Sequence, residues 1–529
     1  MGLVRNVSTI GGLTLVSRFL GMARDMLMAR YVGAGMAADA FLIAWRLPNL
    51  FRALFAEGAF AAVFVPMFNR HLAEGEREAE GRGLAAARDF AAQILSVLLP
   101  FLVIFTGLMM LAAAPIVWAM TGGFPDGGPE KFALATTLTI ITFPYLALIS
   151  IVSLLGGILN SLGRFWVNAA APILLNICMI AALLFFRGQN AVDTAVTQAI
   201  AVTVSGVLQL GWLAIACRQA GMGVRPGVPR LTGDVKRMLA LIAPAAIGQG
   251  AIQFNLLIST SLAARYLPQG AVSYLYYADR LNQLPLGLIG IGVGTAILPT
   301  LSRQIGGADG KAAHATQNRA LELALFLALP AAISLIVAAL PMVRGLFQHG
   351  EFTNADALGT AGALAAFSLG VPAYVLIKVL TPGFYARHDT KTPVRLALWA
   401  MLVNLIGNLI LIWPLAHVGV ALATAISAWV NVALLYVTLH RRGHLALDAR
   451  FKAKAWRMLI ASIAMGGALW WLGNRLDAQL LGDLWSRILW LGALVAGGGI
   501  IYALAILLLG TYRLSELSSL LRRQPKKTD

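Results

Sequence analysis

Apolar residues along the chain fall in long runs that are separated by short polar segments. Most runs are about 20 to 30 residues long, and a helix of that length rises 1.5 Å per residue and crosses about 30 Å of hydrocarbon. The alternation in blocks of about ten residues that is typical of a membrane β-barrel is absent from the sequence. The pattern therefore predicts an all-α polytopic membrane protein.

The runs predict about fourteen membrane-spanning helices. The first six are expected at 8–34, 37–68, 90–120, 131–160, 166–186 and 191–217. The next six are expected at 238–266, 272–303, 314–341, 355–386, 391–413 and 417–440. A last pair is expected at 456–474 and 485–510.

Composition supports this class. Of the 529 residues, 59% are hydrophobic and 12% are charged, whereas a soluble domain has about 45 to 50% apolar and about 25% charged residues. The two cysteines, Cys178 and Cys217, lie inside apolar runs, which predicts neither a disulfide framework nor a thiol metal site. Charged residues interrupt the first run, so we expect no cleavable signal peptide.

The charge distribution indicates orientation. The formal net charge is +18, and with a cytoplasmic N-terminus the basic residues between the spans favour the cytoplasmic side by about four to one. The few on the outer side are Arg30, Lys131, Arg187, Arg265, Arg344, Arg475 and Arg487. This bias matches the positive-inside rule, so we attribute the charge to orientation and lipid headgroups rather than to nucleic acid. Both termini are predicted to be cytoplasmic.

The sequence contains an internal repeat. Ala29-Arg30-Tyr31 and Trp45-Arg46-Leu47 correspond to Ala264-Arg265-Tyr266 and Asp279-Arg280-Leu281, at an offset of about 234 residues. Six helices fit within one period, so the halves should have the same orientation in the membrane.

The repeat predicts two pseudo-symmetric lobes of six helices, with the substrate between them and alternating access as the mode of transport. We expect an N-terminal lobe at 1–220, a C-terminal lobe at 221–445, and two additional helices with a basic cytoplasmic tail at 446–529.

Ten charged residues lie inside the predicted spans, where each costs about 2.5 to 3.5 kcal/mol unless it is hydrated or paired. They are Arg18, Arg24, Asp25, Asp39, Arg46, Arg52, Glu57, Asp279, Arg280 and Lys378. Six bases against four acids leave a positive balance. A cavity with surplus guanidinium suits an anion, because the planar fork of arginine binds phosphate or carboxylate bidentately.

Helical spacing predicts some pairs among these charges. Residues seven apart share a helix face, which pairs Arg18 with Asp25 and Asp39 with Arg46. These four side chains could be structural.

The other charges have less obvious partners. Arg24, Arg52 and Arg280 lack an evident partner on their own helices. Asp279 and its neighbour Arg280 could form an ion pair that serves packing. Lys378 could extend its aliphatic side chain so that its ammonium group lies at the membrane surface.

Asn404, Asn408 and Thr424 could line a cation site or could hydrogen-bond between helices. Nucleotide-binding and hydrolase motifs are absent from the sequence, so we predict no enzyme activity and no cofactor. Uphill transport would then use an ion gradient or the membrane potential.

Several segments are similar to a known family. In the first two spans they are Ser17-Arg18-Phe19-Leu20-Gly21, Arg24-Asp25, Ala38-Asp39-Ala40-Phe41, Arg46-Leu47-Pro48-Asn49, Arg52 and Ala56-Glu57-Gly58-Ala59. Later segments are Tyr276-Tyr277-Ala278-Asp279-Arg280-Leu281 and Pro382-Gly383-Phe384-Tyr385-Ala386-Arg387. Together with the predicted helix count, they resemble the MurJ (MviN) family of lipid II flippases over essentially the whole chain.

The resemblance implies membership of the multidrug/oligosaccharidyl-lipid/polysaccharide exporter superfamily. It also implies substrate-binding residues, with the arginines facing a pyrophosphate: Arg18, Arg24, Asp25, Asp39, Arg52 and Arg280. Secondary candidates are Arg46, Glu57, Asp279 and Lys378.

Two further implications concern the C-terminal half. In the family, the two extra helices help to form a groove for the polyprenyl tail. Some members bind sodium, and Asn404, Asn408 and Thr424 fit that arrangement, but Thr260 stands where a carboxylate would be expected. We therefore predict no metal site.

The leading hypothesis is a flippase in the bacterial inner membrane that moves undecaprenyl-pyrophosphate disaccharide-pentapeptide to the outer leaflet for cell-wall synthesis. Its expected partners are that lipid-linked saccharide, membrane lipids and cell-wall synthesis proteins, but no nucleic acid. One alternative is a cation-coupled exporter of drugs or metabolites. Another is a membrane scaffold for cell-wall enzymes, which would tolerate every substitution of a cavity charge.

Overall fold

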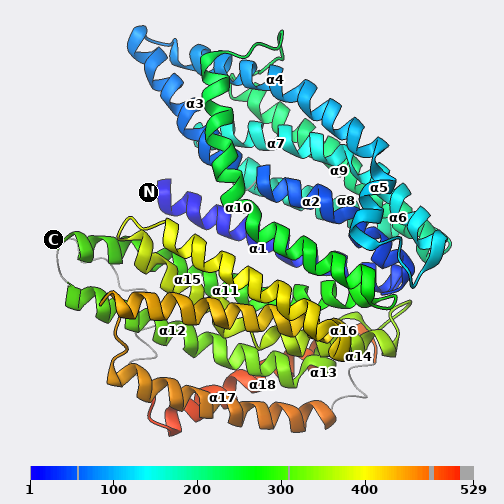
Figure 1. Cartoon of the computed structure of the whole chain (residues 1–529), viewed down its shortest axis with the longest axis vertical. Coiled ribbons are helices and arrows are strands. Elements are labelled where there is room, and N and C mark those ends of the chain that lie inside the picture. The colour runs from blue at the N-terminus through cyan, green and yellow to red at the C-terminus, as the bar shows by residue number, and fades with distance from the viewer. Residues whose placement is uncertain (1, 56–58, 308–309, 476–481, 513–529) are drawn as a thin grey trace. The chain divides into compact units, whose positions relative to one another are not determined.

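The computed structural model describes residues 2–55, 59–307, 310–475 and 482–512, and all regular structure within them is helical. The helices form two compact units (Figure 1). The N-terminal unit consists of Met1–Ser273 and His349–Phe352, and the C-terminal unit consists of Tyr274–Gln348 and Thr353–Asp529.

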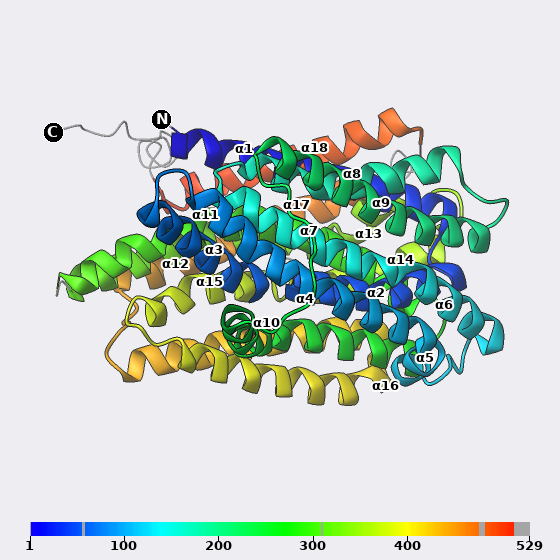
Figure 2. The ribbon, with the colours of Figure 1, turned by 90° about the horizontal axis from the view of Figure 1, so that it is seen from above.

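The N-terminal unit contains α1 (Gly2–Val32), α2 (Met36–Phe55), α3 (Ala59–Glu78), α4 (Gly83–Leu111), α5 (Ala113–Thr121), α6 (Gly128–Thr142), α7 (Pro144–Ser161), α8 (Phe165–Phe185), α9 (Ala191–Gln219) and α10 (Gly233–Tyr266). Among these helices α1 packs along α8, and the two lie side by side in Figure 2. The helix α10 belongs to this unit by its packing against α2 and α3. The predicted boundary between the lobes near residue 220 was inferred from the internal repeat, and it stays a prediction.

The C-terminal unit contains the remaining helices. They are α11 (Ala271–Gly306), whose first three residues belong to the N-terminal unit, α12 (Gly310–Val337), α13 (Ala339–Phe347), α14 (Asn354–Ser368), α15 (Val371–Tyr385), α16 (Lys391–Arg441), α17 (Ala449–Arg475) and α18 (Leu484–Leu508).

Proline explains most differences from the predicted spans. Four predicted spans are each divided into two helices, and each division lies within three residues of a proline: Pro115, Pro144, Pro341 or Pro372. Proline has no N–H to donate and its ring crowds the preceding turn, so it favours the first turn of a new helix. The predicted span 37–68 is described as α2 and α3, and residues 56–58 lie outside the described residues.

The two predicted spans 391–413 and 417–440 are joined as α16. Ala416 has non-helical angles (φ 48°, ψ −132°) two residues after Pro414. The chain reverses direction there, and the two halves of α16 pack against each other: Asn404 donates a hydrogen bond to Thr424. Nine helical stretches in the described residues are long and apolar enough to cross a membrane, and the count of fourteen crossings stays a prediction.

The core of the N-terminal unit contains an aromatic ladder. Phe60, Phe64 and Phe68 recur one turn apart on α3, with neighbouring ring centroids 5.3 and 5.6 Å apart. Phe64 also lies 5.8 Å from the ring of Phe90 on α4. A Cβ on Gly157 would come within 2.9 Å of Phe64. A small residue in α7 therefore permits the close approach of α3, as at other helix contacts in membranes.

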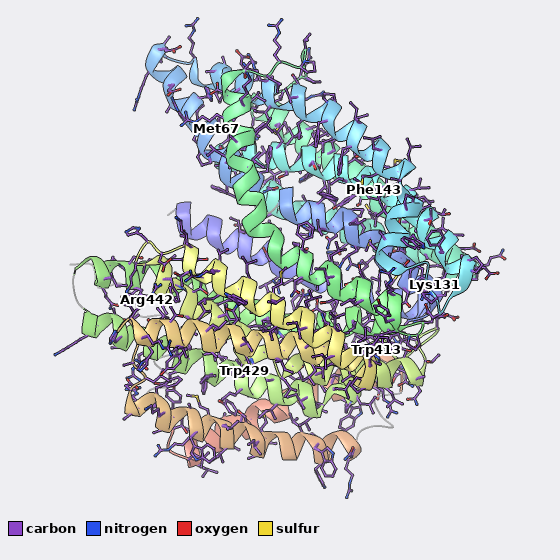
Figure 3. All side chains as sticks on the ribbon, viewed as in Figure 1. Met67, Lys131, Phe143, Trp413, Trp429 and Arg442 are labelled. Carbon is purple, nitrogen blue, oxygen red and sulfur yellow. The ribbon has the colours of Figure 1, made fainter. Side chains whose placement is uncertain are left out.

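Large apolar side chains on many helices are exposed. Trp413 is 71% and Trp399 is 58% exposed on α16, and Phe185 is 77% exposed at the end of α8. Figure 3 labels Trp413 and Trp429 on α16. Exposed apolar faces of this extent are expected where lipid is the solvent.

Candidate functional site

Arg24 and Asp25 form a buried ion pair on α1. Their side chains are 8% and 3% exposed, and Nε and Nη2 of Arg24 donate to one oxygen of Asp25 at 3.0 and 2.7 Å. Nη1 of Arg24 donates to Oδ1 of Asn176 on α8 at 3.1 Å. The amide of Asn176 in turn donates to the backbone oxygen of Ser17 at 3.0 Å. Arg24 thus has partners both on α1 and on α8, contrary to the expectation from spacing.

Arg18 differs from Arg24. It is exposed, and it has no hydrogen-bond or ion-pair partner among the described residues. The predicted pair of Arg18 and Asp25 is therefore wrong, because Asp25 is bound to its neighbour Arg24. Arg18 and Asp25 share a helix face, but the guanidinium of the adjacent residue Arg24 lies closer to the carboxylate and binds it.

Asp39 is the second buried carboxylate of the N-terminal unit, and it is 1% exposed. One oxygen accepts the backbone N–H and the hydroxyl of Ser273 at 3.0 and 2.6 Å. The other accepts the backbone N–H of Gly270 at 2.7 Å and the ammonium of Lys131 at 3.1 Å. Asp39 therefore caps the first turn of α11, where the backbone N–H groups lack partners within the helix and favour an anion.

Arg46 does not bind Asp39, so the second predicted pair is also wrong. Its Nη2 donates to the hydroxyl of Thr260 at 2.7 Å and to the backbone oxygen of Leu256 at 3.0 Å. Both acceptors lie on α10, so Arg46 connects α2 to α10 within the N-terminal unit. Lys131, which the charge distribution assigns to the outer side of the membrane, is only 2% exposed.

Arg52 is half-buried, and its Nε donates to Oδ1 of Asn49 on the preceding turn at 2.9 Å. Glu57 lies outside the described residues. Of the predicted arginines of this unit, Arg18 and Arg52 therefore keep solvent access, whereas Arg24 is enclosed.

In the C-terminal unit, Arg280 is half-buried on α11. Its Nη2 donates to the hydroxyl of Tyr276 at 3.1 Å, and its guanidinium lies 4.9 Å from the centre of that ring. The neighbouring Asp279 accepts a hydrogen bond from Gln283. Each charge thus has a partner one turn away on the same helix. Lys378 is exposed on α15.

The predicted cation ligands form a hydrogen-bonded chain inside α16. Asn404 and Asn408 are fully buried. The amide of Asn408 donates to Oδ1 of Asn404 at 3.1 Å, and that of Asn404 donates to the hydroxyl of Thr424 at 3.2 Å. Thr424 donates to the backbone oxygen of Val420 at 2.9 Å. The bond from Asn404 to Thr424 joins the two halves of the hairpin, and the other two bonds lie within one half each. Among the described residues no cluster of three or more His, Cys, Asp or Glu side chains could hold a metal.

A groove of about 330 Å³ lies between α12, α17 and α18. Its lining is mainly apolar and includes Leu327, Met465 and Val495. At one wall, Pro330 cannot donate to the backbone oxygen of Phe326, and the hydroxyl of Tyr502 on α18 donates to that oxygen at 2.9 Å. A proline in α12 thus creates the acceptor that binds α18.

A buried ionic cluster joins α17 to α12. Glu322 is 3% exposed, and its oxygens lie 2.8 Å from Nζ of Lys454 and 2.6 Å from Nη1 of Arg319. The hydroxyl of Tyr512, beyond the end of α18, donates to Glu322 at 2.6 Å. Glu322 was not predicted from the sequence, where only its spacing of three residues from Arg319 indicates an ion pair.

The loop before α16 is also held by an ion pair. Arg442, labelled in Figure 3, donates to Asp389 at 2.7 Å. Hydrogen bonds from Thr392, and then from Arg442, hold the pKa of Asp389 well below its usual value. Nearby, burial lowers the pKa of His444, and the positive charges of Arg387 and Arg442 lower it further.

Comparisons with known proteins agree over the whole chain. Residues 28–488 match the family model described as lipid II flippase MurJ. A probable lipid II flippase MurJ of Rhizobium tropici is 41% identical over 99% of this chain and 97% of its own length. That of Vibrio cholerae is 38% identical over 98% of each chain.

Solved structures show the same fold. An inward closed conformation of a lipid II flippase MurJ matches with a TM-score of 0.75 at 24% identity, and covers 97% of this chain and 99% of its own. An inward-facing multidrug resistance transporter of the MATE family and the MOP superfamily matches with a TM-score of 0.63 at 15% identity, over 82% of this chain and 97% of its own. The predicted all-α polytopic membrane class is confirmed.

Proposed function

The chain belongs to the MurJ family of lipid II flippases, and from this premise we propose how its residues serve that function. The protein moves lipid II, an undecaprenyl-pyrophosphate-linked disaccharide-pentapeptide, from the inner to the outer leaflet of the bacterial plasma membrane. Relatives with this name align with nearly the whole chain, which supports the flippase over a drug exporter. The movement supplies precursor for peptidoglycan synthesis.

The exposed guanidinium of Arg18 is the observation that carries the substrate assignment. Arg18 lies in the middle of α1, is exposed, and has no partner among the described residues. An unpaired charge at this depth costs several kcal/mol in lipid, so it requires water or an anionic ligand. A guanidinium binds two phosphate oxygens at once with charge-assisted hydrogen bonds. Arg18 therefore binds the pyrophosphate, and Arg52 and Arg280 are further candidates.

The buried residues have supporting roles in this proposal. Arg24 and Asp25 neutralise each other and hold α1 against α8 through Asn176. Asp39 holds the first turn of α11. These residues keep the helices that carry Arg18 and Arg280 in place, and they do so without contacting substrate.

The groove between α12, α17 and α18 receives the polyprenyl tail. Its apolar lining matches a hydrocarbon chain, and the family resemblance assigns the two extra helices to this role. The headgroup passes through the protein by alternating access while the tail stays in the membrane. Both termini are cytoplasmic, and no covalent bond of the substrate is changed.

The test uses the purified chain in vesicles that contain fluorescent lipid II, with a membrane-impermeant reductant that bleaches only the exposed leaflet. We expect vesicles with the protein to lose nearly all fluorescence and vesicles without it about half. A matched lipid with one phosphate in place of two should be moved more slowly. Equal rates for both lipids would contradict recognition of the pyrophosphate, and no movement of either would contradict the function.

A further inference from the structure

Lys131 is the most deeply buried basic side chain among the described residues. Its Nζ lies 3.1 Å from Oδ2 of Asp39 and 3.1 Å from Oδ2 of Asp126. It also lies 4.7 Å from the ring centre of Phe124, which is itself fully buried. Figure 3 shows Lys131 at the end of the N-terminal unit where α5 and α6 lie.

The stem of Lys131 is enclosed independently of α11. A Cβ on Gly127 would come within 2.3 Å of Cδ of Lys131, so the turn before α6 wraps closely around the stem. Phe124 in the same turn has a left-handed backbone (φ 54°), a conformation that costs energy for a residue with a side chain. The turn thus places the ammonium group beneath Asp39.

The remaining contacts of Asp39 are to the start of α11 and to Gly270 just before it. Gly270 and Ser273 donate their backbone N–H groups, and Ser273 also donates its hydroxyl. These donors are neutral, and a buried carboxylate without a counter-ion is costly. Lys131 supplies the positive charge, and by binding Oδ2 it fixes the rotation of the carboxylate so that Oδ1 faces Ser273.

We infer that Lys131 is a positioning residue for transport, which holds the Asp39 carboxylate in the orientation that caps the first turn of α11. It acts through Asp39 and does not contact the substrate. The inference rests on the proposed function, because the helix that is held in place carries Arg280 on its third turn. Its structural part, the capping of α11, is measurable without any substrate.

A double-mutant cycle tests the inference. The variants are Lys131→Met, Asp39→Asn and the two combined, with Glu130→Gln as the matched control, because Glu130 is the exposed neighbour of Lys131. Each also carries Val272→Cys in a background without Cys178 and Cys217. Val272 is 4% exposed in the first turn of α11, so its reaction with a membrane-impermeant maleimide reports release of that turn.

We expect Lys131→Met and Asp39→Asn each to raise the labelling rate about tenfold, and the combined variant to raise it no further, since coupled residues are not additive. Lys131→Arg keeps the positive charge, so its labelling rate should lie between those of the unsubstituted chain and Lys131→Met. Glu130→Gln should leave the labelling rate unchanged. The variants that are labelled faster should also translocate fluorescent lipid II more slowly. The combined variant removes both buried charges of the pair formed by Lys131 and Asp39. Asp126 also loses Lys131 as a partner, but its side chain is 19% exposed and is hydrated by solvent.

Multiplicative effects of the two substitutions, or native labelling in Lys131→Met, would overturn the inference. Vesicles in which the unsubstituted chain moves no lipid II would instead overturn the proposed function. In that case the labelling cycle would still decide whether Lys131 positions Asp39. The two failures are thus distinguishable.

Discussion

Arg18 and Arg24 lie less than two turns apart on α1, yet their surroundings are opposite. Arg24 is 7% exposed and is bound by Asp25 and Asn176. Arg18 is exposed and has no partner among the residues that the structure describes. The family resemblance assigns both to the pyrophosphate. Enclosure thus separates an arginine that supports the helix packing from an arginine that is available to an anion.

The largest effect should come from Arg24→Ala. Asp25 would remain buried with its ion-pair partner removed, and breaking a buried pair in this way costs about 3 to 5 kcal/mol. Denaturant unfolding in detergent should show this loss of stability. Replacing both residues, as Arg24→Leu with Asp25→Leu, should recover most of it. Native stability of Arg24→Ala would remove the distinction between the two arginines.

Arg18→Ala should have a smaller effect, confined to substrate binding. Loss of a charge-assisted hydrogen bond corresponds to about 1.5 to 3 kcal/mol, or roughly a tenfold to hundredfold decrease in lipid II transport. The free energy of unfolding should change by less than about 0.5 kcal/mol, since the side chain is exposed. Arg18→Lys should lie between the two, because an ammonium keeps the charge but not the fork. If Arg18→Ala unfolds at a lower denaturant concentration than the unsubstituted chain, Arg18 stabilises the fold as Arg24 does.

An uncharged buried contact should have a smaller effect than either arginine. Tyr502→Phe removes the hydrogen bond to the backbone oxygen of Phe326, and such bonds in membrane proteins contribute about 0.6 kcal/mol. We expect a small loss of stability and a larger loss of affinity for lipids with long polyprenyl tails, measured by tail-length competition. An unchanged preference for tail length would separate Tyr502 from the groove.

The smallest effect is expected at the partly exposed pair of Asp389 and Arg442. Because the pKa of Asp389 is lowered in the folded protein, its contribution is present above the unfolded-state pKa and is lost as pH falls through the folded one. Asp389→Asn should cost below about 0.5 kcal/mol at neutral pH. Unfolding measured across pH should show a constant difference down to about pH 5 and a decline only below about pH 4. A difference that disappears between pH 7 and pH 5 would contradict this assignment.

Much of the fold was predictable because each membrane-spanning helix corresponds to a long apolar run in the sequence. The runs located the helices, and Pro144 and Pro372 each lie in the first turn of a new helix. The hairpin turn of α16 also falls between the two predicted spans, at Ala416. The packing of α10 against α2 and α3 was not predictable, because hydropathy does not indicate which helices are neighbours.

The candidate site was predictable only in part. The motifs identified Arg24, Asp25 and Asp39, but spacing on one helix does not indicate partners on another. Asn176 lies 152 residues from Arg24, and Lys131 lies 92 residues from Asp39. The charge distribution assigned Lys131 only to the outer side of the membrane and did not indicate its burial. Its burial depends on a turn with left-handed residues that wraps around its stem.

Native mass spectrometry of lipid II bound to the purified protein measures whether Arg18 contributes to substrate binding. Arg225→Ala is the matched control, because Arg225 is exposed in the loop between α9 and α10. We predict that the unsubstituted chain and Arg225→Ala bind lipid II equally and that Arg18→Ala binds it at least about tenfold more weakly. Equal binding by Arg18→Ala would contradict the claim that the exposed arginine of α1 binds the pyrophosphate.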